Sequence, residues 1–217
     1  MPKERVAVYF DGFNLYHGLS DLKADYLKWV NLWKLSELLI SRNSQKLVKV
    51  DYFSAYAEHF KNTPQEPSLH RHKAYVSALE AKGVTFVEGN FANRKWSFSG
   101  GPRYRAIWKR REEKQTDVAI GVNVIRDAFR DVFDIAMIVS ADADMQPVFR
   151  MMQQEFGDKK CITVAPPQRP HHQSLIDLAD DVRTIRRSQI EKALFGAVVR
   201  KGLKVVSRRP LAYRPPA

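Results

Sequence analysis

Two aspartates lie one residue apart in the stretch VSADADMQP, residues 139–147, directly after the apolar run DIAMIV. An apolar run of this length is typical of a buried strand, so Ser140, Asp142 and Asp144 are expected where that strand ends. Unpaired carboxylates are rare at such a place because burial disfavours their charged form. Their position therefore raises the question of what they bind.

Two other segments carry acids in comparable positions. The apolar run RVAVYF, residues 5–10, ends in DGFN, which supplies Asp11 and Asn14. A segment with helical spacing opens with KQTDVA, which places Asp117 at its N-terminus, three residues after Lys114. If the strands form an open parallel sheet, these acids meet Asp142 and Asp144 at the edge where such sheets bind their ligands.

Each acid also has a structural explanation. Asp117 fits the positive end of a helix dipole, Ser140, Asp142 or Asp144 fits a helix cap, and Asp11 fits a turn. Placing all four aspartates in one cleft would cost electrostatic free energy, because two carboxylates about 4 Å apart repel by roughly 4 kcal/mol at an effective dielectric near 20. A divalent cation removes that cost, and Mg²⁺ and Mn²⁺ prefer carboxylate oxygens. The pattern predicts a site for one or two such ions.

Strands and helices are expected to alternate along the chain. Strands are predicted over residues 5–10, 47–57, 84–91, 134–140 and 161–167, and helices over 32–39, 70–83, 117–131 and 145–157, with a further helical segment over 175–185. Such alternation is typical of βαβ units with right-handed crossovers. The sequence therefore predicts an α/β fold with a mainly parallel central sheet.

A hairpin is predicted over residues 94–112, where two alternating runs flank Gly100-Gly101-Pro102. The formal net charge of the chain is +12, and it is concentrated in two segments. Residues 94–114 hold eight Lys and Arg against two Glu, and residues 186–217 hold nine against one. Such concentration is typical of docking onto a polyanion.

The hairpin combines cations with aromatic rings. Cations can hold phosphates, and rings can stack on unpaired bases. The candidate nucleic-acid-binding residues are Arg94, Lys95, Trp96, Arg103, Tyr104, Arg105, Trp108, Lys109, Arg110 and Arg111. Packing of the rings onto the domain, and a simply solvated basic tail, are the alternative interpretations.

The remaining features of the sequence limit the class of protein to which the chain can belong. The chain has 217 residues, its apolar runs fall short of the roughly 20 residues that span a bilayer, and no cleavable signal is evident at the N-terminus. Cys161 is the only cysteine, so an internal disulfide is excluded. The histidines at 70, 72, 171 and 172 lack the spacing of a zinc or histidine-based nuclease site. A cytoplasmic protein with no membrane contact is expected.

Three motifs, VAVYFDGFNLY, EKQTDVAIGVNVIRDA and IVSADADMQPVFRMM, resemble NYN domains of the PIN-like nuclease superfamily, in particular the bacterial LabA-like group. The resemblance covers about residues 5–166. It implies a PIN-like three-layer α/β sandwich and a Mg²⁺- or Mn²⁺-dependent ribonuclease. Residues 1–166 are accordingly expected to form the nuclease domain, with the hairpin inserted, and 167–217 a helical, basic extension with a disordered tail.

The family motifs map onto single residues of this chain. Asp11 and Asn14 match the first-strand motif, Lys114 and Asp117 match K-x-x-D, and Ser140, Asp142 and Asp144 match S-x-D-x-D. Ala141 and Ala143 replace the glycine of many relatives, and Met145 replaces a common phenylalanine. The resemblance implies that the four aspartates hold metal, with Asn14, Ser140 and Lys114 supporting them.

Three functions are compatible with these residues to different degrees. The first is an endoribonuclease that uses a metal-activated water, and the second is a non-catalytic RNA-binding module that retains the acidic cleft. The third, an aspartyl phosphatase, requires D-x-D, whereas the chain has Asp11-Gly12-Phe13. A nucleotide triphosphatase lacks its phosphate loop. RNA is the expected partner, with homo-oligomers as a further expectation, and charge alone does not distinguish RNA from DNA.

Overall fold

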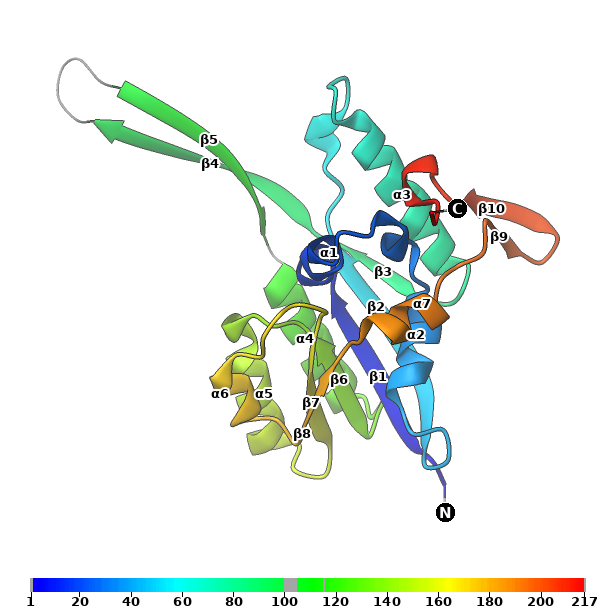
Figure 1. Cartoon of the computed structure of the whole chain (residues 1–217). Coiled ribbons are helices and arrows are strands. Elements are labelled where there is room, and N and C mark those ends of the chain that lie inside the picture. The colour runs from blue at the N-terminus through cyan, green and yellow to red at the C-terminus, as the bar shows by residue number, and fades with distance from the viewer. Residues whose placement is uncertain (1, 100–104, 115, 217) are drawn as a thin grey trace.

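A parallel sheet forms the centre of the protein (Figure 1). The computed structural model describes residues 2–99, 105–114 and 116–216, and from 90 to 114 it describes the backbone alone. The sheet has six strands in the order β3-β2-β1-β6-β7-β8, and all neighbouring strands are parallel. The strands are β1 (Glu4–Asp11), β2 (Gln45–Ser54), β3 (Thr85–Glu88), β6 (Ile135–Val139), β7 (Lys160–Ala165) and β8 (Asp181–Thr184).

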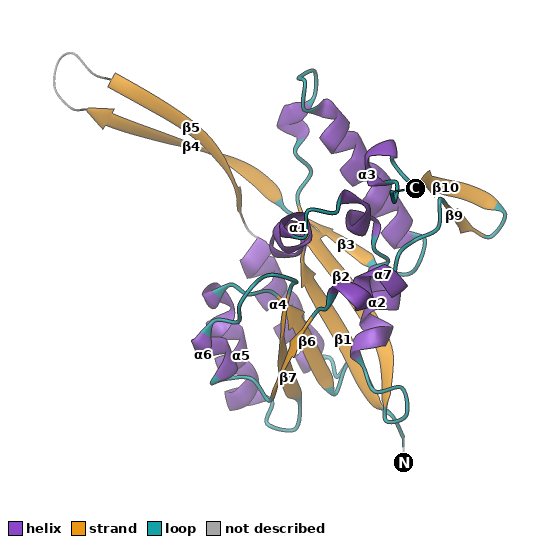
Figure 2. Ribbon diagram, viewed as in Figure 1, coloured by secondary structure: helices purple, strands orange, loops and turns teal. Residues whose placement is uncertain are grey.

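Helices cover both faces of the sheet (Figure 2). One face packs against α1 (Gly12–Asp21), α2 (Leu32–Leu39), α3 (Glu66–Glu80) and α7 (Arg187–Lys192), and the other against α4 (Thr116–Phe129), α5 (Gln146–Glu155) and α6 (Gln173–Ile176). Strand β1 serves both cores because successive side chains alternate: Val6, Val8 and Phe10 enter the first, and Ala7 and Tyr9 the second. Four 3₁₀ turns complete the described elements: η1 (Asp25–Trp29), η2 (Glu58–Phe60), η3 (Ala143–Met145) and η4 (Leu211–Tyr213). The predicted α/β sandwich with a parallel sheet is confirmed.

The strand order reverses between β1 and β6. From β1 the chain moves outward through β2 and β3, then returns to the other side of β1 and continues through β6, β7 and β8. In open α/β sheets ligands bind off the carboxyl ends of the strands at such a reversal. Two of the three acidic segments predicted from the sequence follow these two strands, β1 and β6, and the third, with Asp117, opens α4.

The predicted hairpin lies between β3 and α4. Strands β4 (Asn90–Ser99) and β5 (Arg105–Lys114) pair antiparallel with each other and form a sheet separate from the central one. Figure 1 shows them projecting from the body. The turn at Gly100-Gly101-Pro102, together with Arg103 and Tyr104, lies outside the described residues.

The C-terminal part differs from the expectation. A helix over residues 175–185 is wrong, because α6 ends at Ile176 and β8 then pairs parallel with β7. The sheet thus continues past residue 166. The tail is also ordered where disorder was expected: β9 (Val198–Lys201) and β10 (Lys204–Arg208) form a hairpin whose Ser207 hydroxyl donates to the carbonyl of Ala74 on α3 at 2.6 Å.

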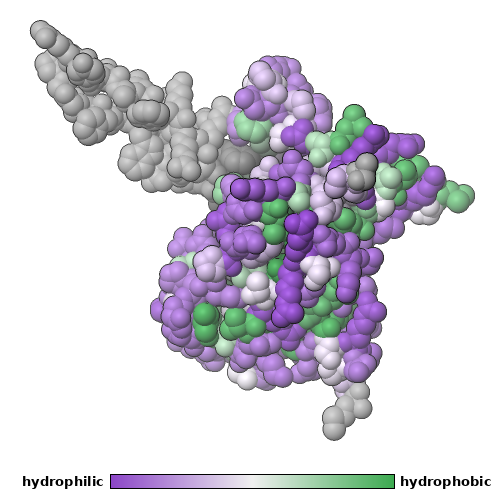
Figure 3. Space-filling model, viewed as in Figure 1, coloured by the Kyte–Doolittle hydropathy of each residue, from purple (hydrophilic) through white to green (hydrophobic). Residues whose placement is uncertain are grey.

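Figure 3 shows a face on which hydrophilic residues predominate and hydrophobic residues form small separate areas. In the part of the chain that the structure describes, every helix is too short or too polar to cross a bilayer.

Candidate metal centre at the sheet reversal

Asp11 ends β1 and caps α1. It is buried, its Oδ1 accepts the backbone N–H of Asn14 at 3.0 Å, and its Oδ2 accepts the hydroxyl of Ser140 at 2.9 Å. The helix begins immediately because residue 12 is glycine: a Cβ there would lie 2.5 Å from the carbonyl oxygen of Phe53. Gly12 therefore lets α1 start against β2 and holds Asp11 at the sheet edge.

The loop after β6 is organised by its own polar side chains. The hydroxyl of Ser140 accepts the backbone N–H of Asp142 at 3.1 Å, and Oδ1 of Asp142 accepts the N–H of Asp144 at 3.0 Å. Asp142 thereby caps the 3₁₀ turn η3, from which α5 continues. The Asp142 carboxylate is thus held by a backbone contact of the loop, and the backbone of Asp144 is held by Asp142, so both residues have a defined relation to β6.

Asp117, in the first turn of α4, completes an acidic group with Asp142 and Asp144. One ligand oxygen from each of these three carboxylates lies within 4.8 Å of the other two. Oxygens bound to a single Mg²⁺ at about 2.1 Å are at most roughly 4.2 Å apart, so a small inward movement of the side chains would suffice. Three carboxylates, with Asp144 exposed to solvent, fit a hard divalent cation.

Asp11 lies beside this group, with both oxygens already accepting hydrogen bonds. Its charge is close enough to affect the others. Burial, followed by repulsion from Asp11, Asp142 and Asp144, raises the pKa of Asp117 to about 6. Burial also raises the pKa of Asp11, against the opposing effect of hydrogen bonds from Asn14 and Ser140. The site accumulates negative charge that a cation would offset.

The supporting residues predicted from the sequence are placed unequally. The backbone and side chain of Asn14 hydrogen-bond to Asp11, and Ser140 joins Asp11 to the loop of Asp142. Lys114 ends β5, three residues before Asp117, so the base of the hairpin adjoins the acidic group, but its side chain lies outside the described residues. The same holds for the side chains of the ten hairpin candidates.

Sequence reasoning missed a pocket beside the first turn of α1. It has a volume of about 320 Å³, and Gly12 and Phe13 lie in its wall together with Tyr52, His72 and Tyr213. These residues come from β2, α3 and the C-terminal turn as well as α1. Residues so far apart in sequence, and without a shared motif, offered no signal that could have grouped them.

The model of the NYN domain family matches residues 5–186, which include every strand of the central sheet and all of the acids described above. The chain belongs to the NYN domain family. The match ends beyond β8, in agreement with the extent of the sheet.

A curated relative of this NYN protein is 6-hydroxy-3-succinoylpyridine 3-monooxygenase HspA from Pseudomonas putida. The two are 27% identical over 176 residues, which is 69% of this chain and 55% of the relative. The chain thus spans about half the length of that curated relative.

A solved structure with the same fold is a protein of unknown function from Vibrio parahaemolyticus. Its TM-score is 0.54 at 20% identity, and the alignment covers 85% of this chain and 94% of the other. At this identity the likeness supports the fold.

Proposed function

We propose that this NYN protein is a Mg²⁺- or Mn²⁺-dependent endoribonuclease. The observation that carries the proposal is the group of Asp117, Asp142 and Asp144, with ligand oxygens within 4.8 Å of one another, at the point where the strand order reverses. Membership of the NYN family favours the same function. The cytoplasm is the compartment we expect for it.

The three clustered carboxylates would hold the cation. When bound, such an ion lowers the pKa of a water ligand and offsets charge on the phosphate being attacked. Asp11, held by Ser140 and Asn14, keeps a fourth negative charge next to the group, which strengthens cation binding. We infer that hydrolysis leaves a 5′-phosphate and a 3′-hydroxyl.

The basic hairpin would hold the RNA. Its backbone leaves the body next to α4, where Asp117 lies, so an RNA strand on the hairpin would lead to the acidic group. Lys114, at the base of β5, is the cation we assign to the scissile phosphate. The cations and rings farther along β4 and β5 would bind flanking phosphates and bases.

An RNA cleavage assay tests this proposal. Wild-type protein with Mn²⁺ or Mg²⁺ is expected to cut internally in RNA, EDTA is expected to abolish cutting, and Asp142→Asn is expected to reduce it by at least about a hundredfold. Asp158→Asn, an exposed acid beyond the far end of α5, is the matched control and should cut at the wild-type rate. Salt-dependent RNA binding without cutting under either metal would favour the non-catalytic module instead.

A second candidate is oxidation of a small aromatic molecule, favoured by the name of the Pseudomonas relative as a monooxygenase. Non-haem iron oxygenases commonly use two histidines and one carboxylate, whereas the described acidic group contains carboxylates alone. Carboxylate oxygens suit Mg²⁺ and Mn²⁺ better, so we favour the nuclease. Oxygen consumption with 6-hydroxy-3-succinoylpyridine, without RNA cleavage, would reverse this preference.

A further inference from the structure

A pocket of about 320 Å³ opens beside the first turn of α1. Its size is at the small end of the range of roughly 300–1,000 Å³ typical of small-molecule sites. Gly12 lies in its wall and directly follows Asp11, so the pocket and the acids share the end of β1. The pocket could therefore hold a group attached to whatever binds at the acids.

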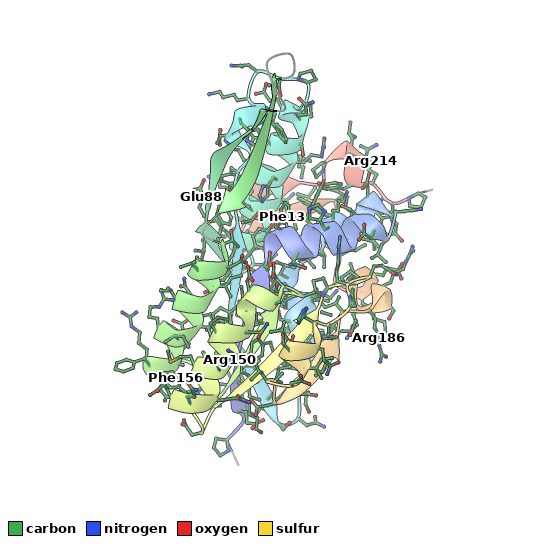
Figure 4. All side chains as sticks on the ribbon, turned by 90° about the vertical axis from the view of Figure 1, so that its left-hand side faces the viewer. Phe13, Glu88, Arg150, Phe156, Arg186 and Arg214 are labelled. Carbon is green, nitrogen blue, oxygen red and sulfur yellow. The ribbon has the colours of Figure 1, made fainter. Side chains whose placement is uncertain are left out.

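Aromatic rings form much of the wall. Tyr52 and Tyr75 meet edge to face at 5.9 Å and 85°, and they fix one side of the pocket. Phe13 and Tyr16 keep half or nearly half of their surface exposed, at 50% and 45%, on the first turns of α1. Figure 4 places Phe13 on α1 beside the base of the hairpin. Exposed flat rings next to a cavity offer stacking surfaces for another flat ring.

The polar groups of the pocket suit a neutral ring that carries both donors and acceptors. His72 is held near Tyr52, with its Nε2 3.4 Å from the hydroxyl, and burial lowers its pKa to about 4. At neutral pH its imidazole is therefore uncharged and has one donor and one acceptor nitrogen. Lys28 lies in the wall with its Nζ 4.8 Å from the centre of the Tyr16 ring and 2.6 Å from Asp25.

None of the described residues that line the pocket is an acid. A ligand that pairs a flat heteroaromatic ring with a phosphate would thus meet rings, a neutral imidazole and one lysine inside the pocket, and carboxylates only outside it. Nucleobases have this chemistry, since their edges carry donors and acceptors and every base has a face that stacks.

We propose that this pocket binds an unpaired nucleobase of the nucleotide next to the phosphate at the acidic group. The assignment rests on the proposed nuclease function for the identity of that phosphate, but the pocket itself can be tested without cleavage. It also gives the C-terminal segment a role, because Tyr213 of η4 is one of the residues that line the pocket.

Fluorescence of 2-aminopurine riboside 5′-monophosphate tests the pocket in the full chain, because stacking quenches this base. We expect saturable quenching by wild type. Tyr16→Ala should weaken binding at least about tenfold, as expected for loss of one stacking ring. Ser68→Trp, which places a ring into the pocket from α3, should abolish binding. Phe129→Ala, which removes an 84% exposed ring from α4, is the matched control and should bind as wild type does.

Competition identifies the ligand chemistry. Adenosine monophosphate should displace the probe, and neither ribose 5-phosphate nor benzoate should do so at the same concentration. The proposal would be overturned if wild type left the probe unquenched, or if Tyr16→Ala and Ser68→Trp both bound the probe as tightly as wild type does. Displacement of the probe by ribose 5-phosphate or by benzoate would also overturn it.

RNA cleavage measured on the same proteins separates this inference from the proposed function. If the protein binds the base but does not cut RNA in Mn²⁺, the base-binding proposal stands and the nuclease proposal is wrong. If Tyr16→Ala and Ser68→Trp both bind the probe and cut RNA as wild type does, the base-binding proposal is wrong and the nuclease proposal stands.

Discussion

The hydroxyl of Ser140 donates to Oδ2 of Asp11 at 2.9 Å and joins the carboxyl ends of β6 and β1. The hydroxyl oxygen of Ser140 also accepts the backbone N–H of Asp142 at 3.1 Å. One small side chain thus connects the buried aspartate to the loop that carries two of the three clustered acids. Its position at the reversal of strand order makes it a positioning residue for the whole site.

Removal of this hydroxyl is expected to impair the site without unfolding the protein. In Ser140→Ala, Asp11 loses a hydrogen bond that lowers its pKa, and the Asp142 loop loses its anchor. Loss of such outer contacts typically costs about tenfold to a hundredfold in metal affinity or activity. Titration with Mn²⁺, followed by RNA cleavage rates, measures the effect. Ser188→Ala, at an exposed serine of α7, is the control, and equal losses in both variants would contradict the role of Ser140.

Cation binding should weaken in acid. Asp117 has a pKa raised to about 6 by burial and by the neighbouring carboxylates, so protons compete with the cation below that pH. The affinity for Mn²⁺ should fall up to about tenfold per pH unit below pH 6, and isothermal titration from pH 5 to pH 8 measures it. Asp117→Asn should bind more weakly and lose this pH dependence. A wild-type affinity that is flat across this range would count against the described geometry.

The same raised pKa predicts an effect on the stability of the metal-free protein. A carboxyl group whose pKa is higher in the folded state than in the unfolded state stabilises the fold at low pH, and this contribution is lost as the pH rises through about 6. Since Asp117 is half-buried and solvent screens part of the repulsion, Asp117→Asn should stabilise the protein at pH 8 by about 1 kcal/mol. Urea unfolding in EDTA measures this, and a destabilised variant would contradict it.

A buried charge network on the α4 face should be essential for stability. Lys49 lies between the carboxylates of Asp51, at 2.9 Å, and Asp127, which also accepts the hydroxyl of Tyr9 at 3.0 Å. Lys49→Met leaves two buried carboxylates without their shared cation and should cost about 3–5 kcal/mol of unfolding free energy. Lys46→Met, on the same strand at an exposed position, is the control for urea unfolding. A loss below about 1 kcal/mol in Lys49→Met would mean that the network contributes little.

Gly12 should tolerate no side chain. Gly12→Ala places a Cβ 2.5 Å from the carbonyl oxygen of Phe53 and 2.7 Å from the ring of Tyr52, so α1 must shift and Asp11 with it. Overpacking of this kind typically costs about 1–3 kcal/mol. Thermal unfolding and Mn²⁺ affinity should both fall, whereas Gly157→Ala, whose Cβ would have nothing within 4 Å, should change neither. An unchanged Mn²⁺ affinity in Gly12→Ala would show that Gly12 does not help to position the acidic group.

The sequence predicted two of the three acidic segments well because each follows a strand with a clear apolar run. Asp11 and Asp142 fall at the ends of β1 and β6, and parallel strands bring those ends together. Helix α1 was missed because DGFN has the residues of a turn, and the steric need for Gly12 appears only when β2 lies against it.

The C-terminal region could not be predicted from local pattern. Strand β8 is a short edge strand whose four residues are largely exposed, so it lacks an apolar alternation and is stabilised by pairing with β7. The following segment is held by distant partners: the indole N–H of Trp29 donates to the carbonyl of Gly196 at 3.0 Å, and Phe195 packs 5.6 Å from the same ring. The basic composition of residues 186–217 is typical of a solvated tail, so the sequence offered no indication of these contacts. The pocket was hidden because the residues that line it lie far apart in the sequence and share no motif.

Carboxylates from separate segments are proposed to form one cation site, and the position of Mn²⁺ in a crystal would locate that site. An anomalous difference map from crystals soaked in Mn²⁺ should show a peak bound by Asp117, Asp142 and Asp144, and this peak should be absent in Asp142→Asn. A map with no peak at these three residues, or with one that persists unchanged in the variant, would contradict the account.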